Sequence, residues 1–392
     1  MGTRAVRAGQ ATDPQTGAHA TPIYQTSTFV LGDMERSRRL FDGEEAGFVY
    51  SRAGNPTVKA VEEKLSALEG AETAVAFASG MGAASATMLS LLRQGDEVLF
   101  LGPLYGGTRA LLEDLLPRFG ITGRRVEDAT LASSVGANSR MIYIETPTNP
   151  TLAIHDLENA ARVAKAHGMV SVVDNTFATP ILTRPIEHGI DLVLHSATKY
   201  LGGHGDLLGG VVAGNAELIG EIRAEGLRHI GAVLDPHPAF LMLRGMRTLH
   251  LRMPSHCENA RAVAHALREA PGVRRVHYPG FADHPGHAVA ARQMSDFGGM
   301  VSVEFAGGTV AAQAFLDALE LVDHAVSLGD VASLACVPAL STHRLLTPEV
   351  RAADGVTDGL VRISVGVESA ADLVADVLQA AHHAAETALA TR

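Results

Sequence analysis

The chain has 392 residues, of which 46% are hydrophobic and 19% charged, and its formal net charge is −11 at pH 7. This length exceeds what one hydrophobic core usually supports, so we expect a large domain and a smaller one. Because no basic block compensates the negative charge, nucleic acid and anionic membranes are excluded as expected partners. We therefore expect small molecules and copies of the same chain as partners.

Cysteine usage and targeting signals point to a reducing compartment. Cys257 and Cys336 are too few and too far apart for a disulfide framework, and the N-terminus lacks the apolar core of a signal peptide. No apolar run approaches the roughly 20 residues that span a bilayer. The sequence predicts a cytoplasmic protein.

Residues 1 to about 48 show little periodicity, and we expect them to form an N-terminal arm. From residue 57 onward, helical patterns alternate with short apolar runs. These runs are "TAVAFA" (73–78), "DEVLFL" (96–101), "RMIYIE" (140–145), "VSVVD" (170–174), "DLVLHS" (191–196) and "LGGVVAG" (208–214). Runs that are apolar on both faces are typical of buried parallel strands, and the helical segments fit crossovers. The sequence predicts an open, mostly parallel α/β sheet.

The pattern changes after "MLRGMRTLHLRM" (242–253), where long helical stretches enclose two further β-like runs. These are "MVSVEF" (300–305) and "LVRISVG" (360–366). We predict a large domain over residues 49–245 and a smaller C-terminal α/β domain over residues 246–392.

Reactive side chains follow the predicted strands where each strand ends. In chain order they are Ser79, Gly80 and Met81 after the first run, Tyr105 after the second, Asn149 after the third, Asp174 at the end of the fourth, and Ser196, Thr198 and Lys199 after the fifth. Ligands of open parallel sheets bind beyond the carboxyl ends of the strands. We expect these residues to line one crevice.

Lysine is rare in this chain, which has only Lys59, Lys64, Lys165 and Lys199. The first three lie in helical patterns whose apolar spacing predicts a solvent-facing position for each lysine. Lys199 instead follows a buried strand. A Schiff base requires a primary amine, which arginine cannot supply, so this position has a chemical reason to be lysine.

A lysine, a carboxylate and a phosphate cradle together match the needs of pyridoxal phosphate. The glycine turn at Gly80 opens a helix whose backbone N–H groups suit a phosphate, with Ser196 and Thr198 as further donors. Asp174 suits a protonated pyridine nitrogen. "GMGAAS" also resembles a dinucleotide fingerprint, but Ser85 replaces its third glycine and no acidic residue ends the next strand, so we do not expect a nicotinamide cofactor.

Each of these residues alone has an ordinary explanation. A lysine after a strand is usually a solvated loop residue, Asp174 suits a turn, and Tyr105 suits packing at a rim. His204, His284 and His287 lack a further ligand set, so no metal site is predicted. The prediction of a cofactor site depends on the conjunction of residues.

Seven motifs resemble those of the Cys/Met-metabolism enzymes that use pyridoxal phosphate, the cystathionine γ-synthase and γ-lyase group. They are "YSRAGNPT", "FASGMGA", "YGGT", "ETPTNPT", "VVDNTFATP", "HSATKYLGGHGD" and "LVRISVGVE". The likeness runs from about residue 4 to about residue 385, and four further stretches, "GEEAGFVYSR", "GHGD", "GAVLDPH" and "AVSLGD", look most like methionine γ-lyases. The resemblance implies the aspartate-aminotransferase-like fold, known as fold type I.

The resemblance also implies a role for each matching residue. Lys199 holds the cofactor and moves protons, Asp174 pairs with the pyridinium nitrogen, and Tyr105 stacks on the ring and acts as an acid or base. The implied phosphate ligands are Ser79, Gly80, Met81, Ser196 and Thr198, with Tyr50 and Arg52 from a neighbouring subunit. The implied ligands of the substrate carboxylate are Arg362, Ser327 and Asn149. The N-terminal arm contacts a neighbouring subunit, and the expected oligomer is a tetramer built as a dimer of dimers.

The implied reaction is γ-elimination on a sulfur amino acid, with L-methionine giving methanethiol, ammonia and 2-oxobutanoate. Four positions depart from the methionine γ-lyase or cystathionine γ-lyase patterns, and they leave substrate choice open: Gly107, Arg228, His229 and Ala332. The alternatives are cystathionine γ-lyase, γ-replacement on an O-acylhomoserine by a cystathionine γ-synthase or sulfhydrylase, and, remotely, a noncatalytic binding protein of this fold. Loss of Lys199 or Asp174 would mark the last of these, and both are present.

Overall fold

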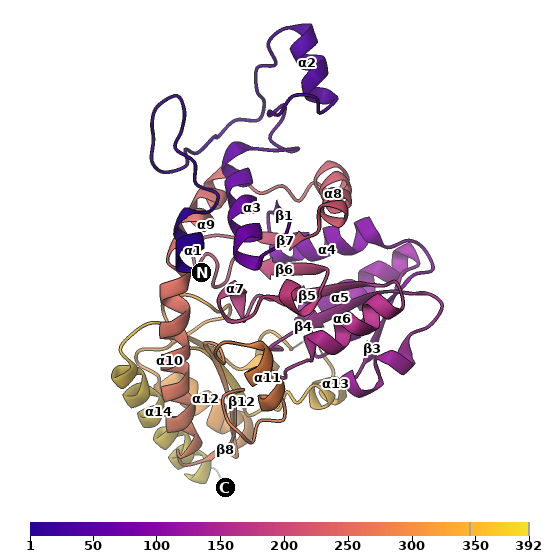
Figure 1. Cartoon of the computed structure of the whole chain (residues 1–392). Helices are drawn as coiled ribbons and strands as arrows, with labels where there is room; N and C mark the ends of the chain where they lie inside the picture. Colours follow the sequence, from indigo (N-terminus) through magenta and orange to yellow (C-terminus); the bar gives the residue numbers. More distant parts are fainter. Residues whose placement is uncertain (345, 391–392) are drawn as a thin grey trace.

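The computed structural model describes residues 1–344 and 346–390. Most of this chain forms two α/β parts, each built around one sheet, with the arm projecting from one side (Figure 1). We call the part around the larger sheet the large layer and the C-terminal part the other layer. The α-helices are α1 (Gly2–Arg7), α2 (Met34–Phe41), α3 (Pro56–Glu69), α4 (Gly80–Leu91), α5 (Gly106–Ala110), α6 (Leu157–Ala166), α7 (Thr179–Leu182), α8 (Ala216–Glu225), α9 (Pro236–Arg247), α10 (Leu249–Arg268), α11 (His287–Gln293), α12 (Gly308–Ala318), α13 (Pro348–Ala353) and α14 (Ala370–Ala390).

Shorter helical turns connect these elements. They are the π-helical turns η1 (Leu111–Leu115) and η6 (Gly226–Ile230), and the 3₁₀ turns η2 (Leu116–Phe119), η3 (Asp128–Thr130), η4 (Ala132–Ser134), η5 (Pro185–His188) and η7 (Pro338–Leu340).

A seven-stranded sheet forms the centre of the large layer in the described part of the chain. Its strands are β1 (Thr73–Phe77), β2 (Glu97–Leu101), β3 (Thr122–Val126), β4 (Ser139–Glu145), β5 (Val170–Asp174), β6 (Leu192–Ser196) and β7 (Gly210–Gly214), in the spatial order β1-β7-β6-β5-β4-β2-β3. The six runs predicted before residue 215 are confirmed as strands. Only β7 is antiparallel to its neighbours, because residues 197–209 return to the sheet without a crossover helix.

The C-terminal part of the chain builds a second sheet of five strands. These are β8 (Val273–His277), β9 (Met300–Phe305), β10 (Asp323–His324), β11 (Leu334–Cys336) and β12 (Leu360–Ser364), in the order β10-β11-β12-β9-β8. The two predicted runs are the central strands β9 and β12. They pair antiparallel, and their apolar side chains pack against α10, α12 and α14 in one core.

Helices cover both faces of the large sheet, which explains why its strands are apolar on both sides. On one face, α4 and α8 pack over side chains such as Phe77, Tyr143 and Val172. On the other face, α3 and α9 pack over Ala76 and neighbouring residues, and α6 packs over the β4–β5 part of the sheet. The site residues that the sequence placed after these strands lie at the carboxyl ends of the parallel strands.

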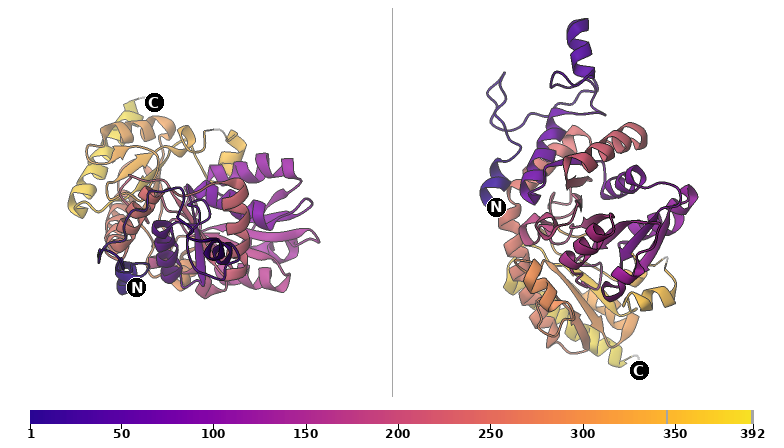
Figure 2. Two further views of the ribbon diagram at one scale, coloured as in Figure 1. Left: turned by 90° about the horizontal axis from the view of Figure 1, so that it is seen from above. Right: turned by 45° about the vertical axis from the view of Figure 1, so that its right-hand side comes forward.

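We propose a domain division at residue 245. This position falls within α9, one turn before the start of α10, which packs on the second sheet. In the right-hand view of Figure 2, the indigo arm with α2 extends away from both sheets. All residues of α2 are at least partly exposed to solvent, and the helix is held by ion pairs such as Arg38 with Asp42 at 2.8 Å.

The predicted solvent-facing position of Lys64 is wrong. Its side chain is fully buried, and Nζ donates a hydrogen bond to the carbonyl oxygen of Ala5 at 2.7 Å. The N-terminal helix α1 covers this face of α3, a contact between residues 59 positions apart that spacing within α3 does not reveal. Lys59 and Lys165 are exposed, as predicted.

Lys64 makes stability depend on pH in the alkaline range. Burial, aided by the charge of Arg247, lowers its pKa from 10.5 to about 8. Between these values the folded protein has lost this proton while the unfolded chain still holds it, so stability rises as the pH rises. We expect wild type to gain about 2 to 3 kcal/mol relative to Lys64→Met between pH 8 and pH 10.5.

Urea unfolding at fixed protein concentration measures this difference. Lys59→Met is the matched control, because Lys59 lies on the exposed side of the same helix. Its stability should follow wild type at every pH. Parallel curves for Lys64→Met and wild type would show that Lys64 keeps an ordinary pKa.

None of the helices in residues 1–344 and 346–390 is long and apolar enough to cross a membrane.

Candidate active site

A cavity of about 470 Å³ lies at the carboxyl ends of β4, β5 and β6. Eleven of the predicted site residues line it together: Ser79, Gly80, Met81, Tyr105, Asn149, Asp174, Ser196, Thr198, Lys199, Ser327 and Arg362. The last two come from the C-terminal part of the chain, so the cavity is closed by both layers. The other nine come from the part of the chain that builds the large sheet, from the strand ends and the segments that follow them.

The turn before α4 brings backbone close to the end of β6. Ser79 caps the helix by accepting a hydrogen bond from the backbone N–H of Gly82 at 3.0 Å. A Cβ at Gly80 would lie 2.7 Å from Cβ of Ser196, so only glycine allows this approach. The first N–H groups of α4 and the hydroxyl of Ser196 therefore face the same space, an arrangement that fits a phosphate.

Asp174 places a carboxylate against this cavity from the end of β5. The hydroxyl and the backbone N–H of Thr176 both donate to Oδ1 of Asp174, and the Thr176 oxygen accepts from the N–H of Ser196 at 2.8 Å. Burial raises the pKa of Asp174, while the bonds from Thr176 and the charge of His195 oppose the rise. A partly buried carboxylate to which no arginine or lysine of the described chain is bonded fits a cationic ring nitrogen.

Lys199 lies in the β6–β7 connection and points into the cavity. Its Nζ donates to Oγ of Ser327 at 2.6 Å. Burial, together with the charge of Arg362, lowers the pKa of Lys199 to about 8. A substantial neutral fraction near pH 8 suits an amine that bonds to an aldehyde and accepts protons.

Arg362 is 3% exposed and is oriented by the two residues that the resemblance grouped with it. One terminal nitrogen donates to Oδ1 of Asn149 at 3.0 Å and the other donates to the carbonyl oxygen of Ser327 at 2.7 Å. Its Nε is buried and has no hydrogen-bond partner among the described residues. Ser327 holds a positive φ of 82°, a conformation that costs energy for serine and is found mainly at functional sites.

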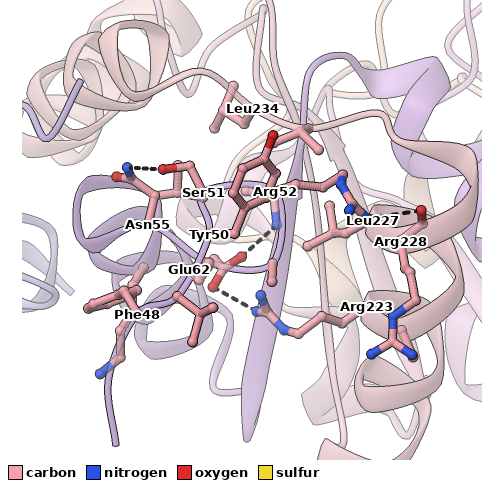
Figure 3. Close-up of a pocket in the computed structure, with 18 of the residues that line it drawn as sticks. Phe48, Tyr50, Ser51, Arg52, Asn55, Glu62, Arg223, Leu227, Arg228 and Leu234 are labelled. Atoms are coloured by element: carbon pink, nitrogen blue, oxygen red, sulfur yellow. Dashed lines mark hydrogen bonds and ion pairs between the residues drawn. The ribbon is translucent and has the colours of Figure 1, made fainter. Parts of the chain in front are cut away.

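Tyr50 and Arg52 do not lie in this cavity. They line a separate cavity of about 990 Å³ between the arm, α3 and α8 (Figure 3). Arg52 donates to the carbonyl oxygen of Arg228 at 3.1 Å, and its guanidinium carbon is 5.6 Å from the ring centroid of Tyr50. The floor is an ion pair of Glu62 with Arg223 at 2.7 Å. Tyr50 is 46% exposed, so both residues remain available to another molecule.

Sequence reasoning missed several residues that line the cavity: Thr108, Glu145, Thr176, Phe177, Ser341 and Thr342. Glu145 ends β4 as Asp174 ends β5, and the two residues are register partners. The strand-end rule that found Asp174 therefore also applied to Glu145. The segment at Ser341 and Thr342 arrives from the other layer, and no local pattern in the sequence signals its position.

The sequence model of the family described as "Cys/Met metabolism PLP-dependent enzyme" matches residues 2–382. The chain is 48% identical to an L-methionine gamma-lyase of Pseudomonas putida, with 96% of each chain covered. It is 42% identical to a cystathionine beta-lyase of Lactococcus lactis subsp. cremoris, covering 96% of this chain and 98% of that one. A solved structure of cystathionine gamma-lyase from Lactobacillus plantarum, complexed with L-serine, superposes with a TM-score of 0.91 at 38% identity, covering 98% of this chain and 99% of that one.

Proposed function

Because the chain belongs to the Cys/Met metabolism PLP-dependent enzyme family, we propose that it cleaves the Cγ–S bond of L-methionine. With one water consumed, the products are methanethiol, ammonia and 2-oxobutanoate. The proposal depends on one observation above all, the lining of the cavity that contains Lys199.

The lining suits an amino acid with one charged end and an apolar tail. Its ionisable residues are Tyr105, Glu145, Asp174, Lys199 and Arg362, and the remaining wall includes Phe177, Leu208, Val326 and Leu328. One arginine matches one carboxylate, and the apolar wall matches a thioether. Cystathionine carries a second amino-acid group, for which the described lining offers no further basic side chain. This arrangement supports methionine.

We assign the cofactor to the same cavity. Pyridoxal phosphate, when bound, supplies an electron sink for the negative charge that develops on the substrate carbon. Asp174 would keep the ring nitrogen protonated, and Lys199 would provide the amine that attaches the cofactor. The residues that would hold the phosphate line the same cavity near the start of α4: Ser79, Gly80, Met81, Ser196 and Thr198.

Three residues bind the substrate or move its protons in the proposed reaction. Arg362 binds the substrate carboxylate through its guanidinium, which Asn149 and Ser327 orient at the cavity. Lys199 Nζ would remove the proton from Cα, give that proton up to the cofactor, and then take a second proton from Cβ as the thiolate leaves. The hydroxyl of Tyr105, a residue 44% exposed at the mouth of the cavity, protonates the departing sulfur.

Tyr50 and Arg52 complete the site of a neighbouring copy in our proposal. Their exposure and their separation from Lys199 in the same chain support this assignment, as does the exposed apolar surface of the arm at Val30, Met34 and Phe41. We propose a dimer as the smallest active unit and a tetramer as the complete assembly.

Cystathionine lyase is the second candidate, and Gly107 favours it. The resemblance places cysteine here in methionine γ-lyases and glycine in relatives that process cystathionine. A Cβ at Gly107 would lie 2.7 Å from Cε1 of Tyr105 and 3.0 Å from Sδ of Met81, so glycine sets the position of the tyrosine ring. Arg228, His229 and Ala332 do not line the cavity of Lys199 in the same chain.

Product analysis of the purified protein decides between the two candidates. L-Methionine and L-cystathionine are supplied separately, and thiols and 2-oxo acids are measured. Methanethiol with 2-oxobutanoate from methionine supports the proposal. Cysteine with 2-oxobutanoate from cystathionine, and little methanethiol, moves the assignment to a cystathionine γ-lyase. Products formed only from an O-acylhomoserine and a thiol overturn both.

A further inference from the structure

Glu145 is a buried carboxylate in the cavity to which neither the family resemblance nor the proposed mechanism gives a role. It is 4% exposed at the end of β4. Its Oε2 accepts a hydrogen bond from the backbone N–H of Tyr105 at 2.7 Å, and its Oε1 accepts one from the N–H of Asn149 at 2.9 Å. The two oxygens thus join two loops that follow different strands.

The loop at Asn149 continues as a series of hydrogen bonds that ends at Lys199. Asn149 orients Arg362, Arg362 bonds the carbonyl oxygen of Ser327, and the hydroxyl of Ser327 accepts from Lys199. On the other side of Glu145 is Tyr105, whose ring lies at the mouth of the cavity. Glu145 is therefore the link between the proposed acid and the residues that bind the substrate carboxylate.

Charged groups around Glu145 shift its pKa in opposite directions. Asp174 on β5 and the buried ring of Tyr143 on β4 are its acidic neighbours, and Arg362 on β12 is the opposing cation. Burial and the charge of Asp174 raise the pKa of Glu145 to about 8, against the two backbone N–H bonds and Arg362. Both oxygens accept N–H bonds, and the ionised carboxylate, which dominates above about pH 8, satisfies both bonds best.

We propose that Glu145 is a positioning residue that holds Tyr105 and Asn149 at a fixed separation, and so sets the distance between the acid that meets the leaving group and the arginine that binds the carboxylate. This inference rests on the proposed function for the roles of Tyr105 and Arg362. Glu145 bonds to none of the proposed phosphate ligands, and it acts on Arg362 only through Asn149.

Glu145→Gln tests this role, because glutamine is isosteric but has only one acceptor oxygen. Its amide nitrogen would face one of the two N–H groups, so one loop shifts. We expect kcat/KM to fall about 10- to 100-fold, the effect of losing one hydrogen bond to a charged group. The affinity of the apoprotein for pyridoxal phosphate should stay near wild type, because the phosphate ligands are not bonded to Glu145.

A double-mutant cycle with Tyr105→Phe separates positioning from general stability. If Glu145 acts through the tyrosine hydroxyl, the fold-loss caused by Glu145→Gln becomes smaller in the Tyr105→Phe background. The matched control is Asp376→Asn, since Asp376 also accepts backbone N–H bonds, from Glu320, Leu321 and Val322, but lies in α14. That control should lower the unfolding temperature and leave kcat/KM unchanged.

A binding measurement provides a readout that needs no turnover. L-Norleucine has a methylene in place of the sulfur of methionine and no leaving group, and its Kd follows from the change in the cofactor spectrum. We expect Glu145→Gln to weaken norleucine binding through the displaced Asn149 and Arg362. If Glu145→Gln does not fold, Glu145→Asp replaces it, because the shorter side chain reaches at most one of the two N–H groups.

Three results overturn the inference. They are unchanged kinetics in the Glu145 variant, strictly additive losses in the cycle, and a loss of activity that only parallels a loss of cofactor affinity or of unfolding temperature. Failure of wild type to release methanethiol from methionine is a different result. It overturns the proposed function, and the cycle is then run with whichever sulfur amino acid wild type consumes.

Discussion

Replacing Lys199 with alanine is expected to lower the rate of 2-oxobutanoate formation by at least about 10³- to 10⁴-fold. Lys199 is the only lysine that lines the described cavity, and its Nζ points at Ser327 beside Arg362. The proposed reaction uses this amine twice, to attach the cofactor and to move protons. Removing it leaves no primary amine within reach of the substrate.

Borohydride reduction followed by peptide mapping tests the attachment independently of turnover. The cofactor should be found on the peptide of Lys199 in wild type and on no lysine peptide of Lys199→Ala. Lys165→Ala is the control, because Lys165 is exposed on α6 and should retain wild-type activity. A Lys199→Ala protein that keeps a tenth of the activity, or that carries the cofactor on another lysine, would contradict the assignment.

Asp174→Asn is expected to lower turnover by about 10²- to 10³-fold and to weaken cofactor binding. Asparagine keeps an oxygen for the two bonds from Thr176 but removes the negative charge that opposes the ring nitrogen. Steady-state kinetics and titration of the apoprotein with pyridoxal phosphate measure the two effects. Asp317→Asn, on the exposed side of α12, is the control and should match wild type.

The same substitution should affect the apoprotein in the opposite direction. Burial raises the folded-state pKa of Asp174 above its unfolded value, so its contribution to stability is present at low pH and is lost as the pH rises through the folded-state pKa. Above that value, apo Asp174→Asn should be at least as stable as apo wild type. Thermal unfolding of both apoproteins checks this, and a large loss of stability in the variant would mean that Asp174 supports the fold directly.

The parts of the fold that sequence patterns predicted are those whose strands are buried on both sides. The missed strands are edge or very short elements. Strand β3 reads "TGRRV" and β8 reads "VRRVH", each at the edge of its sheet, and Arg124, Arg274 and Arg275 in them are exposed. Charged residues protect such edges from pairing with other chains, and they also remove the apolar signal on which prediction depends.

The candidate site was predictable to the extent that it follows strand ends. Asp174 and Lys199 needed only the rule for open sheets, whereas Ser327 and Arg362 entered through family resemblance, because they reach the cavity from another layer. Glu145 was within reach of the same rule and was overlooked in favour of the loop after it. Lys64 shows where helical spacing fails to predict exposure. The helix that buries it, α1, begins at residue 2, far from α3 in the sequence.

The separation of Tyr50 and Arg52 from Lys199 has a genetic consequence if both copies of a dimer build each site. A chain with Lys199→Ala still carries intact Tyr50 and Arg52, and a chain with Arg52→Ala still carries an intact Lys199 cavity. Two inactive alleles expressed together should therefore complement each other. In a mixed dimer, one site combines the sound half of each chain while the other site collects both defects, so up to half of the sites in mixed dimers regain function.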